Sequence, residues 1–136
     1  MAGYSGTPLP KKLGIKPGDK VLAVDAPPHF GSLLDPWPEG AVFATGADGE
    51  FDVIIAFIRT ADQLEPAFKS LTPRVKERGG FWISWPKKAS PLYSPGLTEE
   101  TLRQVGLPTG LVDNKVCAID EDWSGLRFVR RLAEKK

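Results

Sequence analysis

One short run, residues 81–85, constrains the fold more than any other part of the chain. Its sequence, Phe-Trp-Ile-Ser-Trp, is aromatic and β-branched apart from one serine, which is typical of a strand covered on both faces. Gly79 and Gly80 precede the run, and Pro86 ends it because proline cannot donate a hydrogen bond to a neighbouring strand. The run therefore predicts a central, buried strand that leads directly into a polar loop.

The apolar pattern around this run predicts the rest of the sheet. Nearly continuous apolar segments predict strands at residues 20–25, 41–45 and 51–57, and the segments 111–119 and 126–132 predict a hairpin. This order predicts one Rossmann-like α/β domain whose sheet is mainly parallel and carries a C-terminal antiparallel hairpin. We place this domain at residues 16–132, after an N-terminal arm (1–15) and before a charged tail (133–136).

Three helices are expected between these strands. Thr60 and Gln63 have the spacing of a capping box, and an apolar stripe follows them at helical intervals. Pro73 would break that helix, so we expect a second short helix from residue 73 to about residue 78. Thr98 is expected to cap a third helix, which Gly106 ends.

Composition narrows the classes of function. A length of 136 residues suits one domain, and neither a membrane span nor a signal peptide is expected. His29 and Cys117 are the only histidine and the only cysteine, so we expect no intrachain disulfide, no metal site and a cytoplasmic location. The net charge of +1 makes nucleic acid an unlikely partner, although both ends of the chain are basic.

The first candidate site is the loop that follows residues 81–85. Lys87, Lys88 and Ser90 stand just past the carboxyl end of the predicted central strand, and open α/β sheets bind ligands at that edge. Two ammonium groups and a hydroxyl could hold a phosphate or carboxylate group. The alternative interpretation is a solvated basic loop with no ligand.

Further candidates come from polar residues in or beside predicted strands. Asn114 and Lys115 interrupt a predicted strand and are expected to face the same edge as Lys87, unless they mark a β-bulge. Asp25 ends the first strand and could meet a ligand hydroxyl or pair with a lysine of the basic loop. His29 has no evident partner in the sequence, and we expect it to be a partly exposed loop residue. No catalytic residue and no bound cofactor are predicted.

Several of these segments resemble the class I adenosylmethionine-dependent methyltransferases in shortened form. Residues 15–22 are similar to the lead-in to the first strand of that fold, and residues 51–55 to its fourth strand. Residues 71–84 resemble its run into the fifth strand, and 112–131 resemble its closing hairpin. The resemblance implies a glycine-rich cofactor turn at residues 25–29, but these read Asp-Ala-Pro-Pro-His and contain no glycine.

Four longer strings resemble a family of short, uncharacterised bacterial proteins. They are residues 4–9 (YSGTPL), 12–15 (KLGI), 85–90 (WPKKAS) and 107–117 (LPTGLVDNKVC). This resemblance implies a domain of unknown function and supplies no catalytic residues.

Three functions therefore remain open. The first is a non-catalytic module that binds a small anionic ligand or acts in regulation, on a methyltransferase-like scaffold without its cofactor turn. The second is an atypical adenosylmethionine-dependent methyltransferase. The third is a protein that binds nucleic acid or another anionic partner through its basic ends and the lysine loop, with a steep dependence on salt.

Overall fold

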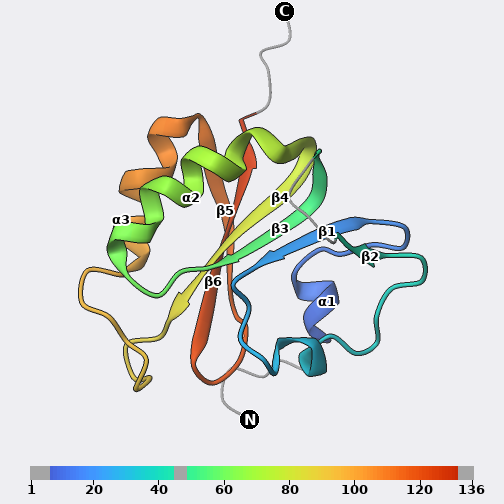
Figure 1. Ribbon diagram of the computed structural model, residues 1–136, viewed down its shortest axis with the longest axis horizontal. Helices are drawn as coiled ribbons and strands as arrows, with labels where there is room; N and C mark the ends of the chain where they lie inside the picture. The colour runs from blue at the N-terminus through green and yellow to red at the C-terminus, as the bar shows by residue number, and fades with distance from the viewer. Residues whose placement is uncertain (1–6, 45–48, 132–136) are drawn as a thin grey trace, which may run out of the picture.

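The computed structural model describes residues 7–44 and 49–131, which form one six-stranded sheet in the order β2-β1-β3-β4-β6-β5 (Figure 1). β1, β2, β3 and β4 are parallel, and β6 is antiparallel to both of its neighbours. The strands are β1 (Lys20–Val24), β2 (Val42–Phe43), β3 (Phe51–Phe57), β4 (Val75–Pro86), β5 (Leu111–Ala118) and β6 (Trp123–Arg130). The predicted Rossmann-like architecture with a C-terminal hairpin is thus confirmed.

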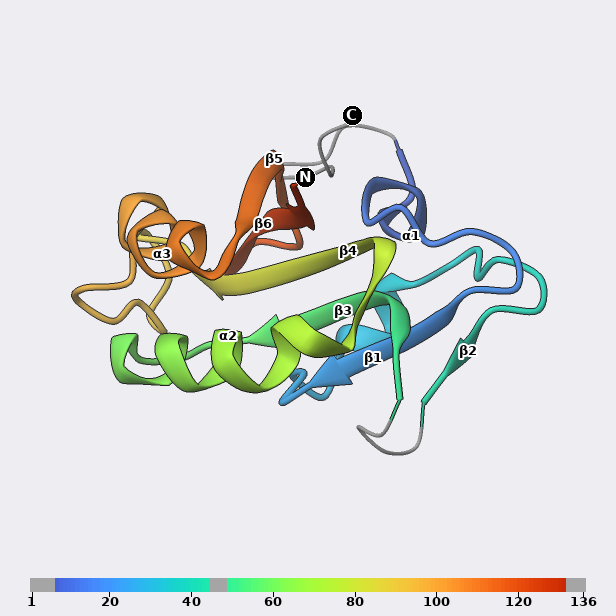
Figure 2. The same ribbon diagram turned by 90° about the horizontal axis from the view of Figure 1, so that it is seen from above.

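Helices lie on both faces of this sheet. α2 (Leu64–Leu71) and α3 (Glu99–Gly106) pack on one face, whereas α1 (Leu9–Lys12) lies on the opposite side (Figure 2). Four 3₁₀ turns, η1 (Phe30–Leu33), η2 (Ala61–Gln63), η3 (Thr72–Arg74) and η4 (Leu107–Thr109), complete the connections. Thr98 caps α3 as predicted, because its Oγ1 accepts a hydrogen bond from Thr101 N at 3.1 Å.

The side chains of β3 and β4 divide the core into two clusters. Ile54 and Phe81 face α2 and α3, whereas Ile55 and Trp82 face α1 and η1. All four side chains are fully buried, so each contributes about 1.5–3 kcal/mol of hydrophobic stabilisation. The prediction that residues 81–85 form a strand covered on both faces is therefore confirmed.

The segment that we separated as an N-terminal arm contributes to this core where it is described. Leu9, Leu13 and Ile15 belong to the cluster on the α1 side. The indole N–H of buried Trp82 donates a hydrogen bond of 3.0 Å to the carbonyl oxygen of Leu13. The segment before β1 is thereby tied to the central strand. Residues 1–6 and the predicted charged tail lie outside the described residues.

The predicted second helix at residues 73–78 is wrong. The chain makes only the short turn η3 and then enters β4 at Val75, which pairs with Phe51. Gly79 and Gly80 lie inside β4 rather than in a turn before it. A Cβ atom on Gly79 would stand 2.7 Å from the carbonyl oxygen of Asp52, so glycine permits the close approach of β3 and β4 at their bulge.

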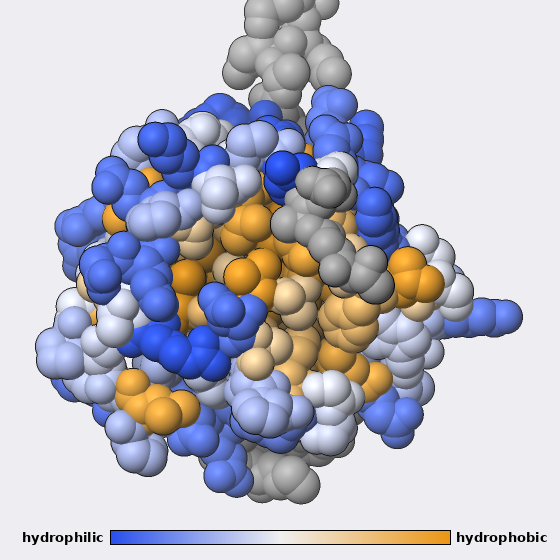
Figure 3. All heavy atoms as spheres, in the orientation of Figure 1, coloured by the Kyte–Doolittle hydropathy of each residue, from blue (hydrophilic) through white to orange (hydrophobic). Residues whose placement is uncertain are grey.

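The outer end of the sheet is thinly covered on the α2 side. Figure 3 shows apolar residues gathered in the middle of this face, over β3 and β1. Val42 on the short strand β2 is 55% exposed, and Val24 and Ala44 are only partly buried.

Among the residues that the structure describes, no helix is long and apolar enough to cross a membrane.

Candidate ligand site at the carboxyl edge of the sheet

The loops after β1, β3 and β4 and the β5–β6 turn meet at the carboxyl edge of the parallel strands. The connection after β1 passes through η1, on the α1 side, whereas the connection after β3 passes through α2 on the opposite face. Such a reversal between neighbouring strands creates the crevice in which α/β proteins bind ligands. The candidate site of this protein is therefore the edge between β1 and β3.

The loop after β1 turns back onto the end of β3. Asp25 has a φ of 57°, a left-handed conformation that is uncommon for a residue other than glycine. The loop then runs through Pro27 and Pro28, neither of which has a backbone N–H to offer a ligand. Phe30 follows, 3% exposed, with its ring 5.0 Å from that of Phe57 in an edge-to-face arrangement. Apolar packing therefore occupies the floor of this edge.

Arg59, just after β3, spans the crevice between β1 and β3. Its Nη1 donates a hydrogen bond of 2.9 Å to the carbonyl oxygen of Asp25. Its guanidinium carbon lies 5.2 Å from the ring centroid of Trp123, in a cation–π contact. Trp123 in turn packs edge-to-face on Phe57 at 5.1 Å. One exposed arginine thus connects the loop after β1 with the start of β6.

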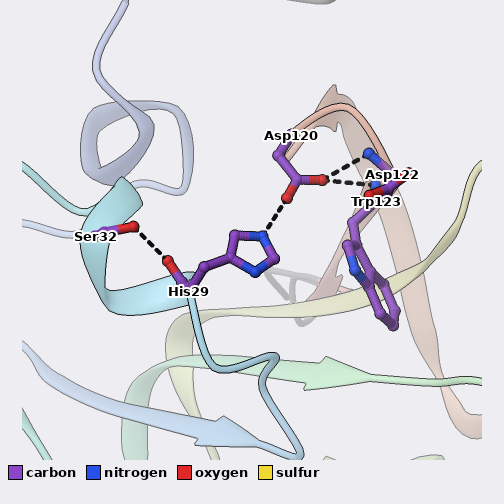
Figure 4. Close-up of polar contacts among 5 residues, drawn as sticks. All are labelled: His29, Ser32, Asp120, Asp122 and Trp123. Carbon is purple, nitrogen blue, oxygen red and sulfur yellow. Dashed lines mark hydrogen bonds and ion pairs between the residues drawn. The ribbon is translucent and has the colours of Figure 1, made fainter.

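A histidine–carboxylate pair makes a second connection across the edge. His29 Nε2 lies 2.6 Å from Asp120 Oδ2, in the β5–β6 turn (Figure 4). The other oxygen of Asp120 accepts hydrogen bonds of 2.8 Å from the backbone N–H groups of Asp122 and Trp123. On the far side, Ser32 Oγ donates to the carbonyl oxygen of His29 at 2.7 Å. His29 is therefore held in place at its backbone carbonyl by Ser32 and at its ring by Asp120.

The environment of Asp120 favours its charged form. Burial acts to raise the pKa of this carboxyl, but the hydrogen bonds from His29, Asp122 and Trp123 outweigh burial and lower the pKa. An ionised carboxylate only accepts hydrogen bonds, so His29 Nε2 carries the proton and Nδ1 stays available to a ligand. The side chain of His29 is 49% exposed and that of Asp120 is 14% exposed. With Nε2 donating to Asp120, Nδ1 can accept a hydrogen bond from a ligand.

The basic loop after β4 lies beside this pair. The backbone N–H of Lys87 donates to the carbonyl oxygen of Asp122 at 2.7 Å, which fixes the loop against the β5–β6 turn. Lys88 is exposed, and in the described part of the chain neither lysine forms an ion pair. Ser90 is 7% exposed, and its Oγ accepts a hydrogen bond from Leu92 N within the loop. The expected pairing of Asp25 with a lysine of this loop is absent from the described contacts, although Asp25 is exposed at the same edge.

The structure does not bring Asn114 and Lys115 to this edge. Asn114 occupies a bulge in the middle of β5, which is the alternative that the sequence left open. Lys115 on β5 lies opposite Arg127 on β6, and Arg127 lies opposite Trp82 on β4. Lys115 is therefore level with Trp82, which precedes Lys87 by five residues. Five strand residues span about 16 Å, too far for these side chains to share one small ligand with the basic loop.

Sequence reasoning missed Arg59, Trp123 and Asp120 as parts of this edge. Arg59 has only its place after a strand to mark it, and Asp120 looks like an ordinary turn residue in the sequence. No spacing rule indicates that Asp120 meets His29, because 91 positions separate them. Among the described residues, no group of three or more histidine, cysteine, aspartate or glutamate side chains could hold a metal ion.

Comparison with solved structures identifies the same fold in methyltransferases. A putative type 11 methyltransferase from Sulfolobus solfataricus is 15% identical, with a TM-score of 0.62 over 94% of this chain and 92% of that one. An adenosylmethionine-dependent methyltransferase from Aquifex aeolicus is also 15% identical, with a TM-score of 0.62 over 87% and 85%. A ribosomal protein L11 methylase from Lactobacillus delbrueckii subsp. bulgaricus is 16% identical, with a TM-score of 0.58 over 91% and 76%.

Sequence comparison adds nothing to this assignment, because no family model and no curated protein matches the chain. The likeness to short bacterial proteins therefore stays a prediction. The residues after β1 do not fit adenosylmethionine in the way that the resemblance implies: Asp25, Pro27 and Pro28 replace the glycine-rich turn, and Phe30 fills the space beneath them. The chain has the fold of the class I methyltransferases, and contacts among Arg59, Trp123, His29 and Asp120 bridge the carboxyl edge beside its first strand.

Proposed function

We propose that this protein is a non-catalytic binding module for a small anionic ligand, built on a methyltransferase-like sheet. The observation that carries the proposal is that the turn after β1 contains no glycine and is held to the β5–β6 region by the His29–Asp120 pair and, through Arg59, by the contact with Trp123. Phe30 is buried against Phe57 beside this edge, and Pro27 and Pro28 offer no backbone N–H group to a cofactor. On this proposal the fold is kept, and the sequence Asp-Ala-Pro-Pro-His at residues 25–29, which contains no glycine, disfavours cofactor binding at the first strand.

The chemistry of the closed edge favours an anion. Lys87 and Lys88 lie beside the β5–β6 turn, and no described ion pair occupies their ammonium groups. His29 is 49% exposed at the same edge, where its Nε2 is bound to Asp120. The two ammonium groups would hold phosphate or carboxylate groups through charge-assisted hydrogen bonds.

The test is calorimetric titration of the purified protein with adenosylmethionine, adenosylhomocysteine and inorganic phosphate, each at moderate salt. We expect no heat from the two adenosyl compounds and weak binding of phosphate. Lys87→Ala/Lys88→Ala should weaken the phosphate signal, whereas Lys69→Ala, an exposed lysine on α2, should leave it unchanged. Tight binding of adenosylmethionine by the unaltered protein would overturn the proposal.

The second candidate is an atypical adenosylmethionine-dependent methyltransferase. The likeness of the whole chain to solved methyltransferases favours it. It requires the loop after β1 to move away from Phe57, against which Phe30 packs. The contact of His29 with Asp120 would have to break, and because His29 is 49% exposed, this costs less than breaking a buried contact. In the variant His29→Ala/Asp120→Asn, this candidate predicts stronger adenosylmethionine binding than in the unaltered protein, and the binding module predicts none in either.

A further inference from the structure

A hollow of about 560 Å³ lies between α1 and the edge strand β5, apart from the carboxyl-edge site. Three lysines line it: Lys11 and Lys12 from α1, and Lys115 from the middle of β5. Thr7 and Cys117 complete its polar lining. In Figure 2, α1 lies on the side of the sheet opposite α2, near β5 and β6. The sequence pattern that singled out Lys115 therefore leads to a different place from Lys87.

Two of the three ammonium groups are held in position by backbone carbonyls. Lys115 Nζ donates to the carbonyl oxygen of Lys12 at 2.9 Å, and Lys12 Nζ donates to that of Ala118 at 3.4 Å. These reciprocal contacts connect α1 with β5 and fix both charges at the wall of the hollow. An ammonium group has three N–H donors, so each of the two lysines keeps donors for a further partner.

Within residues 7–44 and 49–131, no carboxylate forms an ion pair with the lysines of this hollow, Lys11, Lys12 and Lys115. Positive charges gathered in one concave surface repel each other, and the potential in such a hollow attracts anions. The contacts that hold Lys12 and Lys115 thus keep two positive charges at the wall of the hollow, where an anion could bind both.

We propose that the hollow between α1 and β5 binds a small phosphorylated molecule with at least two negative charges. Lys11, Lys12 and Lys115 would hold its phosphate groups, and the hydroxyl of Thr7 would add one hydrogen bond. Val116, which is 52% exposed, provides an apolar wall for the uncharged part of the molecule. This site does not depend on the basic loop after β4 or on whether the carboxyl edge binds a cofactor.

Cys117 makes the proposal testable without an added label, because it is the only cysteine of the chain and it lines the hollow. The measurement is the rate of Cys117 alkylation by N-ethylmaleimide, with and without inorganic pyrophosphate. Potassium chloride at the same ionic strength controls for charge screening. We expect pyrophosphate to slow alkylation about tenfold at saturation, since it occupies the hollow and adds negative charge beside the thiol.

The matched variants separate this site from others. Lys12→Gln/Lys115→Gln should lose the protection by pyrophosphate, whereas Lys16→Gln/Lys69→Gln, which removes two exposed lysines elsewhere, should keep it. Each variant is compared with itself, so a change in basal reactivity does not affect the ratio, and circular dichroism confirms folding. The proposal is overturned if potassium chloride protects equally, if Lys12→Gln/Lys115→Gln keeps full protection, or if protection is lost only in Lys87→Gln/Lys88→Gln. The last outcome would leave the carboxyl-edge site as the anion site.

Discussion

His29 Nε2 and Asp120 Oδ2 are 2.6 Å apart, although 91 residues separate them in the sequence. This contact connects the loop after β1, on one side of the central strands, with the hairpin turn on the other side. The same carboxylate also orders its own turn, because it accepts two backbone hydrogen bonds. Loss of the charge on Asp120 therefore affects both the turn and the closure of the sheet edge.

We expect Asp120→Asn to lower the free energy of unfolding by about 1–2 kcal/mol at pH 7, because a charge-assisted hydrogen bond becomes a neutral one. The pKa of Asp120 is held below its ordinary value of 3.8 in the folded protein. Its contribution to stability is thus present above pH 3.8 and is lost as the pH falls through the lower, folded value. Urea unfolding at pH 7 and near pH 3 should show a gap between the two proteins that narrows in acid. An equal gap at both pH values would contradict this account.

Trp82→Phe should destabilise the protein by about 1–3 kcal/mol beyond the cost of lost packing, because the carbonyl oxygen of Leu13 loses its buried donor. Trp85→Phe is the matched control: Trp85 lies on the same strand, and none of the described hydrogen bonds involves its indole nitrogen. Denaturant unfolding of the two variants measures the difference. If Trp85→Phe proves as costly as Trp82→Phe, the hydrogen bond to Leu13 is not what stabilises the segment before β1.

Gly106→Ala should destabilise by about 1–3 kcal/mol, the usual cost of overpacking a core. A Cβ atom there would stand 2.7 Å from Phe128 Cε2 and 2.8 Å from Phe68 Cζ, and these two rings already pack edge-to-face at 5.0 Å. Gly31→Ala is the control, since a Cβ atom on Gly31 meets nothing within 4 Å. Thermal unfolding followed by circular dichroism compares the two variants. Equal melting temperatures would show that the core around α3 can accommodate the added methyl group without loss of stability.

Cys117 should react slowly with alkylating agents near neutral pH. Burial raises the pKa of its thiol above the ordinary value of 9.0, although Lys12 and Lys115 act in the opposite direction. The rate should therefore rise steeply through alkaline pH, and Lys12→Gln/Lys115→Gln should shift that rise to still higher pH. The pH profile of iodoacetamide alkylation measures both effects. A profile that the double substitution leaves in place would mean that the two lysines do not influence the thiol.

The fold was largely predictable because its signals are local. A buried strand is recognisable from a run such as residues 81–85, and the pair Thr60–Gln63 marks a helix start. Gln63 Oε1 indeed accepts a hydrogen bond from Thr60 N at 3.3 Å. The prediction failed at residues 75–78 because Val75 is drawn into the sheet by pairing with Phe51, a contact with a distant segment that no local pattern encodes.

Residue type and spacing within short windows were enough to predict most of the strands, the hairpin and the lack of glycine at residues 25–29. Which polar residues meet depends instead on how segments far apart in the sequence pack together. In the structure, His29 contacts Asp120 and Arg59 lies across the edge between β1 and β3. Lys115, which we expected at this edge, lines the hollow beside α1 instead. Contacts of this kind depend on strand order and register, and a β-bulge such as the one at Asn114 shifts the side chains that follow it.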